Sequence, residues 1–393
     1  MKKFSKLHIK IIFLSQSKRQ TKQYQLLCKK TDMEGTVINI KRPGILGRFV
    51  KTGRWLVKNR ACIPNWIELQ QEKNKVRGEG AGFLYKWLLV LRIYRVLSKF
   101  IFEFERAKAN VLFVRNGAGY RQTPVIDWCK QQGVSIAYIE NGFLPSTIQL
   151  DGRGVNCNNS IPRNSSFYMD FISENKNSPD KTLVQRQPKV IQSEFDGVEL
   201  PEQYYFVPFQ VPTDTQVLLN SPWIRSMEEF YEVLEKSVEF LPDSFKFVIK
   251  EHPSSNVRLD DYYNRNELIV FANSHNTQNL IENSKAVITL NSTVGIESLL
   301  LGKPVITLGD ACYNIDGLTY HADRLEALGS IISAPDKINY NKVLADKFIA
   351  WLDQVYLIPG KLRDFEKSDS SCFKVKERVE EIYKGAETVT KSV

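Results

Sequence analysis

Residues 285–320 have the sequence KAVITLNSTVGIESLLLGKPVITLGDACYNIDGLTY, which contains a complete strand–turn–helix–strand pattern. Ala286–Leu290 is a short, apolar, β-branched run that is typical of a buried parallel strand. Ile296–Leu301 has a helical pattern, which Gly302 is expected to cap, and Val305–Leu308 is the next expected strand. The stretch therefore predicts a β–α–β unit, the building block of an α/β fold.

The turn inside this unit, residues 291–295, is NSTVG, which is small and rich in hydroxyl groups. Unpaired backbone amides and the helix dipole favour negative charge at such a turn. The ordinary N-cap of a buried helix has the same composition, and short motifs often match by chance. The sequence of the turn alone therefore fits two alternatives, an anion-binding site and an ordinary structural N-cap.

The chain has 393 residues, which is enough for two domains with cores of their own. Its net charge of +10 suggests a partner of opposite sign, such as an anionic membrane surface, a nucleotide or an acidic glycan. Nucleic acid is not expected as a partner, because the basic residues are dispersed and no aromatic–basic recognition motif is found. The composition therefore favours a protein that acts on an anionic small molecule, glycan or surface.

Cysteine usage and hydropathy bear on the location of the protein. Six cysteines are scattered singly, which argues against a disulfide framework or a zinc site and fits a reducing cytosol. No apolar run reaches the roughly 18 residues of a transmembrane helix. The apolar run Ile11–Leu14 is too short for a signal peptide, so we expect a first β-strand there. We predict a cytoplasmic protein that can associate peripherally with the inner membrane.

Strand and helix patterns alternate through both halves of the chain. Residues 41–80 are basic and broken by Gly and Pro, so we expect loop and short helix there. Residues 82–104 predict either a core helix or a basic amphipathic helix on a bilayer surface, and the nearly all-round apolar pattern favours the core. Residues 172–200 have the composition of an interdomain connection. Other expected strands are 110–114, 134–139, 204–211, 245–249 and 267–271, and other expected helices are 123–132, 227–240, 279–284, 343–356 and 375–383.

Polar residues follow four of the expected strands: Glu140, Asp214, the pair Lys250 and His252, and the pair Ser292 and Thr293. In a doubly wound sheet, such strand ends line the ligand crevice. Pro253 disfavours a helical backbone at His252, so Lys250 and His252 could both face a phosphate. The alternative for this pair is a solvated lysine and a histidine with an ordinary structural partner.

Several segments together resemble the bacterial capsule polysaccharide biosynthesis proteins, the single-module Kdo (3-deoxy-D-manno-octulosonic acid) transferases of the KpsS/LipB type. They are YIENGFLPSTIQLDGRGVNCNNSIPRN (138–164), YYFVPFQVPTDTQVLLNSPW (204–223), KEHP (250–253) and the stretch 285–320. The resemblance covers about residues 110–330. It implies a GT-B glycosyltransferase, with two Rossmann-like domains that face each other across a cleft. Residues 1–198 would form the acceptor domain and 199–393 the CMP-sugar donor domain, with the terminal helices able to return to the first domain.

The resemblance also implies site residues and a donor. Asp214, in a Gln-x-x-x-Asp pattern, would be the nucleophile of a retaining transfer from CMP-β-Kdo, and Glu140 on the other domain would be the general base. No metal and no cofactor beyond the donor substrate are expected. The acceptor would be a glycan or a glycolipid, in contact with the inner membrane or a capsule-assembly complex. The residues expected to bind the donor are Gln210, Lys250, His252, Ser292, Thr293 and Glu297.

Two alternatives stay open at this stage. A His-Pro motif with a Ser/Thr phosphate turn also occurs in GT-B transferases that use CMP-sialic acid or CDP-glycerol. A non-catalytic capsule-assembly subunit with the same fold is the other alternative. After Glu140 this chain has Asn-Gly-Phe-Leu-Pro, where the family commonly has Glu-Gly-Tyr-Leu-Arg-Pro, so the arginine expected to help recognise the acceptor is missing. The connection between the domains is also shorter than in the KpsS type, which has a long helical insertion there. From these two departures we expect a glycan end as the acceptor rather than a lipid.

Overall fold

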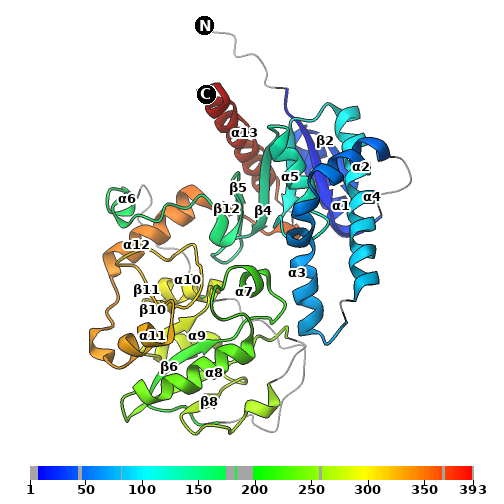
Figure 1. The fold of residues 1–393 in the computed structure, drawn as a ribbon. Helices are drawn as coiled ribbons and strands as arrows, with labels where there is room; N and C mark the ends of the chain where they lie inside the picture. Colours follow the sequence, from blue (N-terminus) through cyan, green and yellow to red (C-terminus); the bar gives the residue numbers. More distant parts are fainter. Residues whose placement is uncertain are drawn as a thin grey trace. The chain divides into compact units, whose positions relative to one another are not determined.

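The computed structural model describes residues 8–42, 47–80, 82–173, 182–183, 198–255, 259–364 and 368–391. The chain divides into two compact α/β units, each built on a six-stranded sheet with helices packed on it (Figure 1). Unit 1 comprises Met1–Gly142, Ser146–Ser160 and Leu357–Val393, and unit 2 comprises Phe143–Pro145 and Ile161–Tyr356. The predicted fold class, with two α/β units built on mainly parallel sheets, is confirmed.

Two parts of the domain prediction are not tested by these units. The predicted boundary between residues 198 and 199 directly follows residues 184–197, which lie outside the described residues, and it stays a prediction. The expected connection at 172–200 lies largely outside them too. The cleft between the two halves also stays a prediction.

The sheet of unit 1 has the order β12-β5-β4-β3-β1-β2. Its four parallel strands are β1 (Lys10–Ser15), β2 (Glu34–Asn39), β3 (Val111–Arg115) and β4 (Ser135–Asn141). The strands β5 (Thr147–Asp151) and β12 (Ile358–Pro359) extend it antiparallel. Neither strand of this antiparallel edge was predicted, and β12, with only two residues, has too little pattern to detect.

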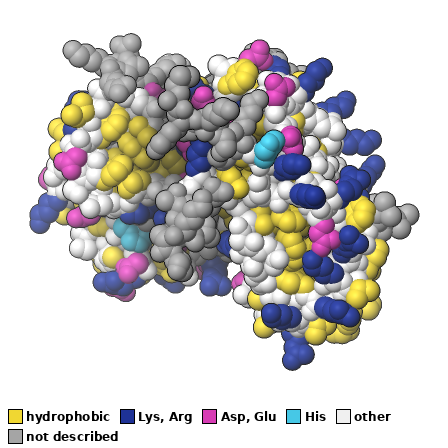
Figure 2. Space-filling view, turned by 90° about the horizontal axis from the view of Figure 1, so that it is seen from above, with side chains coloured by type: hydrophobic (Ala, Val, Ile, Leu, Met, Phe, Trp, Pro, Cys, Tyr) yellow, Lys and Arg dark blue, Asp and Glu magenta, His cyan; other side chains and the backbone are white. Residues whose placement is uncertain are grey.

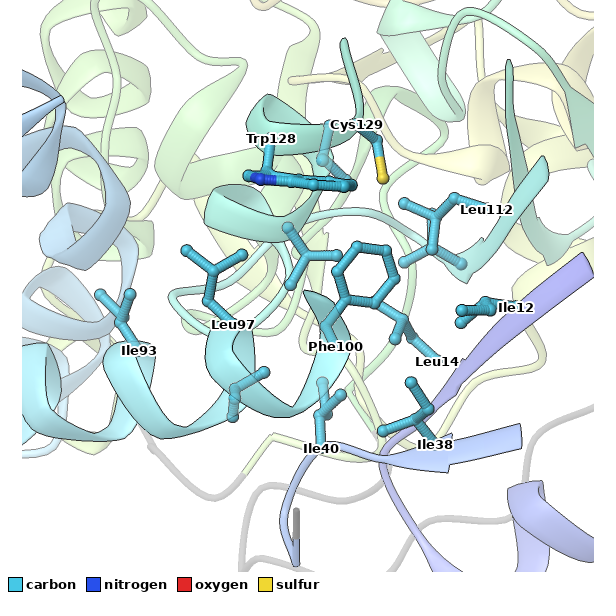
Figure 3. Close-up of a cluster of buried hydrophobic side chains, with 14 of the residues drawn as sticks. Ile12, Leu14, Ile38, Ile40, Ile93, Leu97, Phe100, Leu112, Trp128 and Cys129 are labelled. Atoms are coloured by element: carbon cyan, nitrogen blue, oxygen red, sulfur yellow. The ribbon is translucent and has the colours of Figure 1, made fainter. Parts of the chain in front are cut away.

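Helices cover both faces of this sheet. One face packs against α4 (Phe83–Ala107) and α5 (Thr123–Gln131), where Phe100 and Trp128 meet with ring centroids 5.6 Å apart above Ile12, Leu14 and Leu112 (Figure 3). The other face packs against α1 (Lys18–Thr31) and α13 (Asp369–Lys391). The end of the chain therefore contributes both a strand and a helix to unit 1.

The expectation of loop and short helix at residues 41–80 is wrong, because the segment contains α2 (Phe49–Lys58) and α3 (Ile63–Val76). Tertiary packing stabilises these helices. Trp66 of α3 stacks on Trp55 of α2 with centroids 5.5 Å apart, and its indole nitrogen donates to Asp127 at 2.7 Å. A local pattern of basic residues, Gly and Pro does not reveal such contacts.

All strands of unit 2 are parallel, in the order β11-β10-β9-β6-β7-β8. They are β6 (Gln203–Pro208), β7 (Phe245–Lys250), β8 (Ile269–Phe271), β9 (Ala286–Thr289), β10 (Val305–Thr307) and β11 (Tyr320–His321). The predicted unit at 285–320 is confirmed as β9, α10 (Thr293–Leu300) and β10. Gly302 follows α10 with φ +80°, a left-handed conformation that favours glycine.

Among the remaining helices of unit 2, α8 and α11 pack on one face of this sheet and α9 on the other, and α6 packs against α12. They are α6 (Ser165–Met169), α7 (Thr215–Leu219), α8 (Met227–Ser237), α9 (Thr277–Asn283), α11 (Leu325–Ile332) and α12 (Lys342–Trp351), the last followed by a π-helical turn at Leu352–Tyr356. Single 3-10 turns occur at Arg60–Cys62, Asn156–Asn158, Val238–Phe240, Asp260–Tyr262, Pro335–Lys337 and Leu362–Asp364. None of the helices in the described ranges is both long and apolar enough to span a membrane.

Candidate functional site

The carboxyl ends of the unit 2 strands lie along one edge of the sheet, because all of these strands are parallel. Register places Pro208 of β6 beside Lys250 of β7, and β9 pairs with the other side of β6. The loops that follow these three strands therefore bring together residues from separate parts of the sequence. The predicted residues in these loops or at their borders are Gln210, Asp214, Lys250, His252, Ser292 and Thr293, and Glu297 lies on the helix α10 that follows.

Gln210 and Asn291 form the buried centre of this edge. The Gln210 side-chain amide donates to Asn291 Oδ1 at 3.1 Å, and the Asn291 backbone N–H donates back to Gln210 Oε1 at 3.4 Å. Asn291 Nδ2 also donates to the carbonyls of Gln216 and Asn220, at 3.0 and 2.8 Å. Asn291, which was predicted only as part of a turn, thus ties the loop after β6 to the loop after β9.

Asp214 is the N-cap of α7. It is half-buried, and its Oδ1 accepts a hydrogen bond from the Gln216 backbone N–H at 3.0 Å. The Gln216 carbonyl accepts a hydrogen bond from Asn291, so the first turn of α7, which Asp214 caps, is tied to the centre of the edge. The cap is a structural role, and a carboxylate fixed in this way can also act on a bound substrate.

The turn before α10 forms an N-cap, which is one of the two alternatives predicted for it. Ser292 Oγ accepts from the Val294 backbone N–H at 3.2 Å, and the buried Tyr313 hydroxyl donates to the Ser292 carbonyl. Tyr313 lies so close to Gly295 that a Cβ there would be 2.4 Å from the tyrosine oxygen. Burial is the main cause that raises the pKa of Tyr313 well above its usual value, and the Glu297 carboxylate acts in the same direction. The tyrosine therefore remains a donor, and the anion site stays a prediction.

The Lys-Glu-His-Pro segment is fixed by contacts with the loop after β8. Lys250 Nζ donates to the Asn273 carbonyl at 2.6 Å and to the His275 carbonyl. His252 Nδ1 accepts from the Ser254 backbone N–H at 3.0 Å. A neutral imidazole that accepts at Nδ1 carries its proton at Nε2, so His252 presents a donor there.

A second network beside this segment was missed by the sequence analysis. Asn273 Nδ2 donates to Glu251 Oε2 at 2.8 Å and to the Tyr263 hydroxyl at 2.6 Å, and Tyr263 also bonds to Glu251. Glu251 and Tyr263 lie 12 positions apart in the connection between β7 and β8, and Asn273 follows β8, so the three residues share no local pattern. The only available signal was the acidic residue inside the motif, between Lys250 and His252.

Three buried polar atoms along the same edge have no hydrogen-bond partner among the described residues: Ser221 Oγ, His275 Nδ1 and Asn314 Oδ1. Their loops follow β6, β8 and β10 respectively. Buried polar atoms are nearly always hydrogen-bonded, so such a set is consistent with an edge that takes up a polar ligand. The described residues contain no cluster of His, Cys, Asp and Glu suited to a metal ion.

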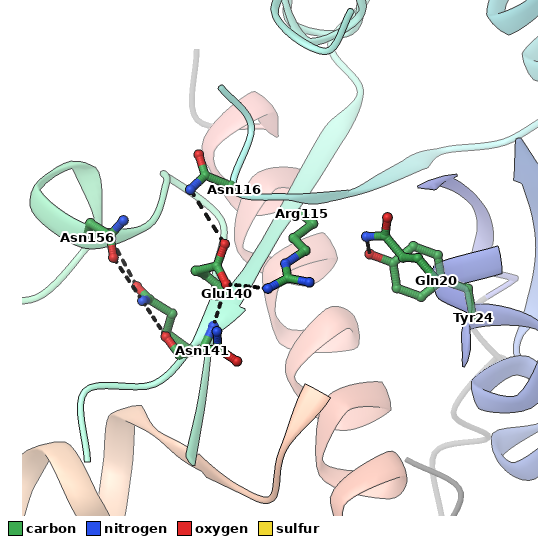
Figure 4. A network of polar contacts seen from close by, with 8 residues as sticks. Gln20, Tyr24, Arg115, Asn116, Glu140, Asn141 and Asn156 are labelled. Carbon is green, nitrogen blue, oxygen red and sulfur yellow. Dashed lines mark hydrogen bonds and ion pairs between the residues drawn. The ribbon is translucent and has the colours of Figure 1, made fainter. Parts of the chain in front are cut away.

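Glu140 belongs to unit 1 and lies in β4, opposite Gln149 of β5, and not beyond a strand as expected. Its carboxylate accepts from Arg115 Nη2 at 3.0 Å, from the Asn141 backbone N–H at 2.9 Å and from Asn116 Nδ2 at 3.5 Å (Figure 4). The side chain is therefore held in a single orientation by three donors.

Arg115 lies between Glu140 and a second polar pair, as Figure 4 shows. Burial opposes the charge of Arg115, but the ion pair and hydrogen bond with Glu140 outweigh it and raise the pKa of the guanidinium. In the second pair, Gln20 Nε2 donates to the Tyr24 hydroxyl at 2.6 Å, and burial raises the pKa of Tyr24. The network fixes the Glu140 carboxylate as a hydrogen-bond acceptor near the carboxyl end of β4.

Comparison with known proteins finds a matching family model and relatives of the chain. Residues 186–337 match the family model described as capsule polysaccharide biosynthesis protein. The chain is 36% identical to the protein FixF of Sinorhizobium fredii over 254 residues, which cover 65% of this chain and 61% of FixF. It is 25% identical to the capsule polysaccharide export protein KpsS of Escherichia coli, over 49% of this chain and 65% of KpsS. The chain thus spans less than two thirds of either relative, and the resemblance indicated by the motifs is confirmed.

Among solved structures, the chain resembles KpsC of Thermosulfurimonas dismutans, a β Kdo 2,7 transferase. The TM-score is 0.41 at 16% sequence identity, covering 71% of this chain and 89% of that chain. A UDP-GlcNAc 2-epimerase of Methanocaldococcus jannaschii gives a TM-score of 0.37 at 13% identity, covering 94% of this chain and 98% of that chain.

Proposed function

We propose that this relative of the capsule polysaccharide biosynthesis proteins is a glycosyltransferase that moves Kdo from CMP-β-Kdo to a glycan or lipid acceptor. The observation that carries the proposal is the position of the predicted donor-binding residues. All of them, from Gln210 to Glu297, lie inside the matched segment 186–337. Except for Glu297, which lies on α10, they lie at or beyond the carboxyl ends of strands in one parallel sheet. In open α/β sheets this edge is where ligands bind.

In this proposal the edge of unit 2 binds the CMP part of the donor. His252 donates from Nε2 to the phosphate, the hydroxyls of Ser292 and Thr293 add donors, and Lys250 adds positive charge. Gln210 fixes the turn through Asn291. Glu297 lies near the ribose or the cytosine. Protein donors then neutralise the leaving phosphate, so transfer would not require a divalent metal.

The proposed transfer proceeds in two displacements. An Asp214 oxygen attacks the anomeric carbon while the bond from that carbon to the CMP phosphate oxygen breaks, which gives a glycosyl–enzyme ester and CMP. The acceptor hydroxyl then attacks the same carbon, Glu140 takes its proton and the Asp214 carboxylate leaves. Two inversions at one carbon give net retention.

We place the reaction in the cytoplasm, where the acceptor would be reached at the inner membrane or within a capsule-assembly complex. The net charge of +10 supports contact with anionic intermediates or surfaces.

The variant Asp214→Asn separates the nucleophile from the helix cap. Asparagine caps helices about as well as aspartate, so the hydrogen bond from the Gln216 N–H and the stability should be retained. As a nucleophile the neutral amide fails, and we expect transfer from CMP-Kdo to drop by at least about a thousandfold. The assay is CMP release and product formation with candidate acceptors, with the product's anomeric configuration read by NMR.

Two controls make this test decisive. CMP affinity of Asp214→Asn should equal that of the unaltered protein, and its melting temperature should be unchanged. Full transfer by the variant would refute the nucleophile, and an inverted product would refute the two-step mechanism. Transfer from CMP-sialic acid or CDP-glycerol, but not from CMP-Kdo, would overturn the donor assignment.

A further inference from the structure

The first half of α4 carries a stripe of large apolar side chains that are open to solvent. Phe83, Leu84, Trp87, Leu88 and Leu91 are 50% to 78% exposed. Their spacing places them on one face of the helix. We call this set the α4 stripe. A row of large apolar residues along one helix is unusual for a surface that meets only water, because soluble proteins keep exposed apolar patches small.

The opposite face of the same helix is already buried in unit 1. Leu89, Ile93, Val96 and Phe100 belong to the core against the sheet. The nearly all-round apolar pattern therefore has two causes: one face fills the core, and the other, at the beginning of the helix, remains uncovered. In Figure 1, α3 and the first turns of α4 extend beyond the strands of the unit 1 sheet.

Basic residues accompany the stripe. Lys86, Arg92 and Arg95 are exposed on the same helix, and residues 83–102 contain neither Asp nor Glu. The neighbouring helix α2 adds exposed Arg54 and Lys58. Figure 2, which views the molecule from above, shows hydrophobic and basic side chains interleaved on its right-hand side, with a few acidic ones among them.

This combination fits one kind of partner. Phe, Trp and Leu on one helix face with Lys and Arg beside them are the features of helices that lie in a membrane interface, where the apolar side chains enter the acyl boundary and the cations meet anionic headgroups. A protein partner of the same size would require acidic groups to match the cations. We propose that the α4 stripe is a docking surface for an anionic lipid bilayer, which positions the protein peripherally on the membrane.

The test is sedimentation of the full chain with two kinds of vesicle, pure phosphatidylcholine and phosphatidylcholine with about one third phosphatidylglycerol. We expect binding to the anionic vesicles, and a weakening of at least about tenfold in Leu84→Ser/Leu88→Ser. The matched control is Ile172→Ser/Val343→Ser, which removes side chains that are 84% and 56% exposed in unit 2 and should leave binding unchanged.

A second pair of variants tests the charges. Arg92→Glu/Arg95→Glu and Lys236→Glu/Lys337→Glu change the net charge equally, and all four residues are exposed. Only the first pair should reduce binding to anionic vesicles, by about tenfold or more at low salt. Equal losses in both pairs would show a diffuse electrostatic effect and overturn the assignment to α4.

The fluorescence of Trp87 tests whether the α4 stripe inserts into the bilayer. Brominated lipids should quench part of the tryptophan fluorescence of the unaltered protein, and Trp87→Phe should bind equally well but lose that quenching. Circular dichroism confirms that each variant is folded. The proposal fails if the unaltered protein binds neither vesicle, or if the α4 variants bind as well as it does. Dissociation of a dimer by the same substitutions, without vesicle binding, would assign the stripe to a second copy of the chain. None of these results depends on the donor, so the glycosyltransferase proposal is tested separately.

Discussion

At the scale of single residues, the candidate site is organised by Asn291. This side chain is 4% exposed and bonds to Gln210, Gln216 and Asn220. The sequence indicated Asn291 only as one member of a polar turn. Its partners lie 71 to 81 positions away in the chain, so no local pattern identifies them. The strand ends could be predicted from the sequence, whereas the contacts between the loops could not.

The substitution Asn291→Ala should destabilise the protein. The Gln210 side-chain amide loses its acceptor, and the carbonyls of Gln216 and Asn220 lose their donor. Such losses at buried groups lower the free energy of unfolding by roughly 2–3 kcal/mol. Urea unfolding measures the change. Asn283→Ala is the control, because its side chain donates to a single carbonyl at an exposed position and should cost less than about 0.5 kcal/mol. Equal costs for the two variants would contradict the central role of Asn291.

At the scale of elements, the sequence predicted structure well wherever the pattern is local. The strand β9, the helix α10 and the cap at Gly302 follow from an apolar run, an N-cap and a glycine within 17 residues. Helices α2 and α3 were not predicted, because they are stabilised by tertiary contacts that a local pattern does not show. Trp66 of α3 stacks on Trp55 of α2 and donates a hydrogen bond to Asp127. One face of α4 packs against the core and the opposite face is exposed. Both faces are rich in large apolar residues, so only the structure shows which residues are buried.

The junction of α2 and α4 provides a pH-dependent prediction. The hydrogen bond and charge of Lys51, and in the same direction Arg48, lower the pKa of Glu105 although partial burial opposes this. A carboxyl group with a lowered pKa in the folded state stabilises the fold above its unfolded pKa of about 4.3, and this contribution disappears as the pH falls through the folded pKa.

Glu105→Gln should therefore lower the free energy of unfolding by about 0.5–1 kcal/mol at pH 7, since the pair is partly exposed. The difference from the unaltered protein should shrink as the pH falls below about 4.3. Thermal melts across a pH series measure this difference. Glu72→Gln removes only the exposed pair with Lys75 and is expected to change little at any pH. A cost that grows on acidification would contradict the assignment.

At the scale of the whole molecule, alternating strands and helices in each half predicted two α/β units. The family resemblance allowed the terminal helices to return to the first domain, but no sequence pattern identified the contacts involved. In unit 1, β12 pairs with β5, and Val375 and Val379 of α13 pack under the sheet. These contacts join residues far apart in the chain. The proposed chemistry needs both units, because Glu140 lies in one and Asp214 in the other.

The most direct test of the account concerns the donor edge of unit 2. Calorimetry should show that the full chain binds CMP at least about tenfold more tightly than cytidine, because the phosphate meets charge-assisted donors. His252→Ala should remove most of that preference, while Asp214→Asn should leave it intact. Equal affinity for CMP and cytidine, or a preference that survives His252→Ala, would contradict a phosphate site at the carboxyl ends of β7 and β9.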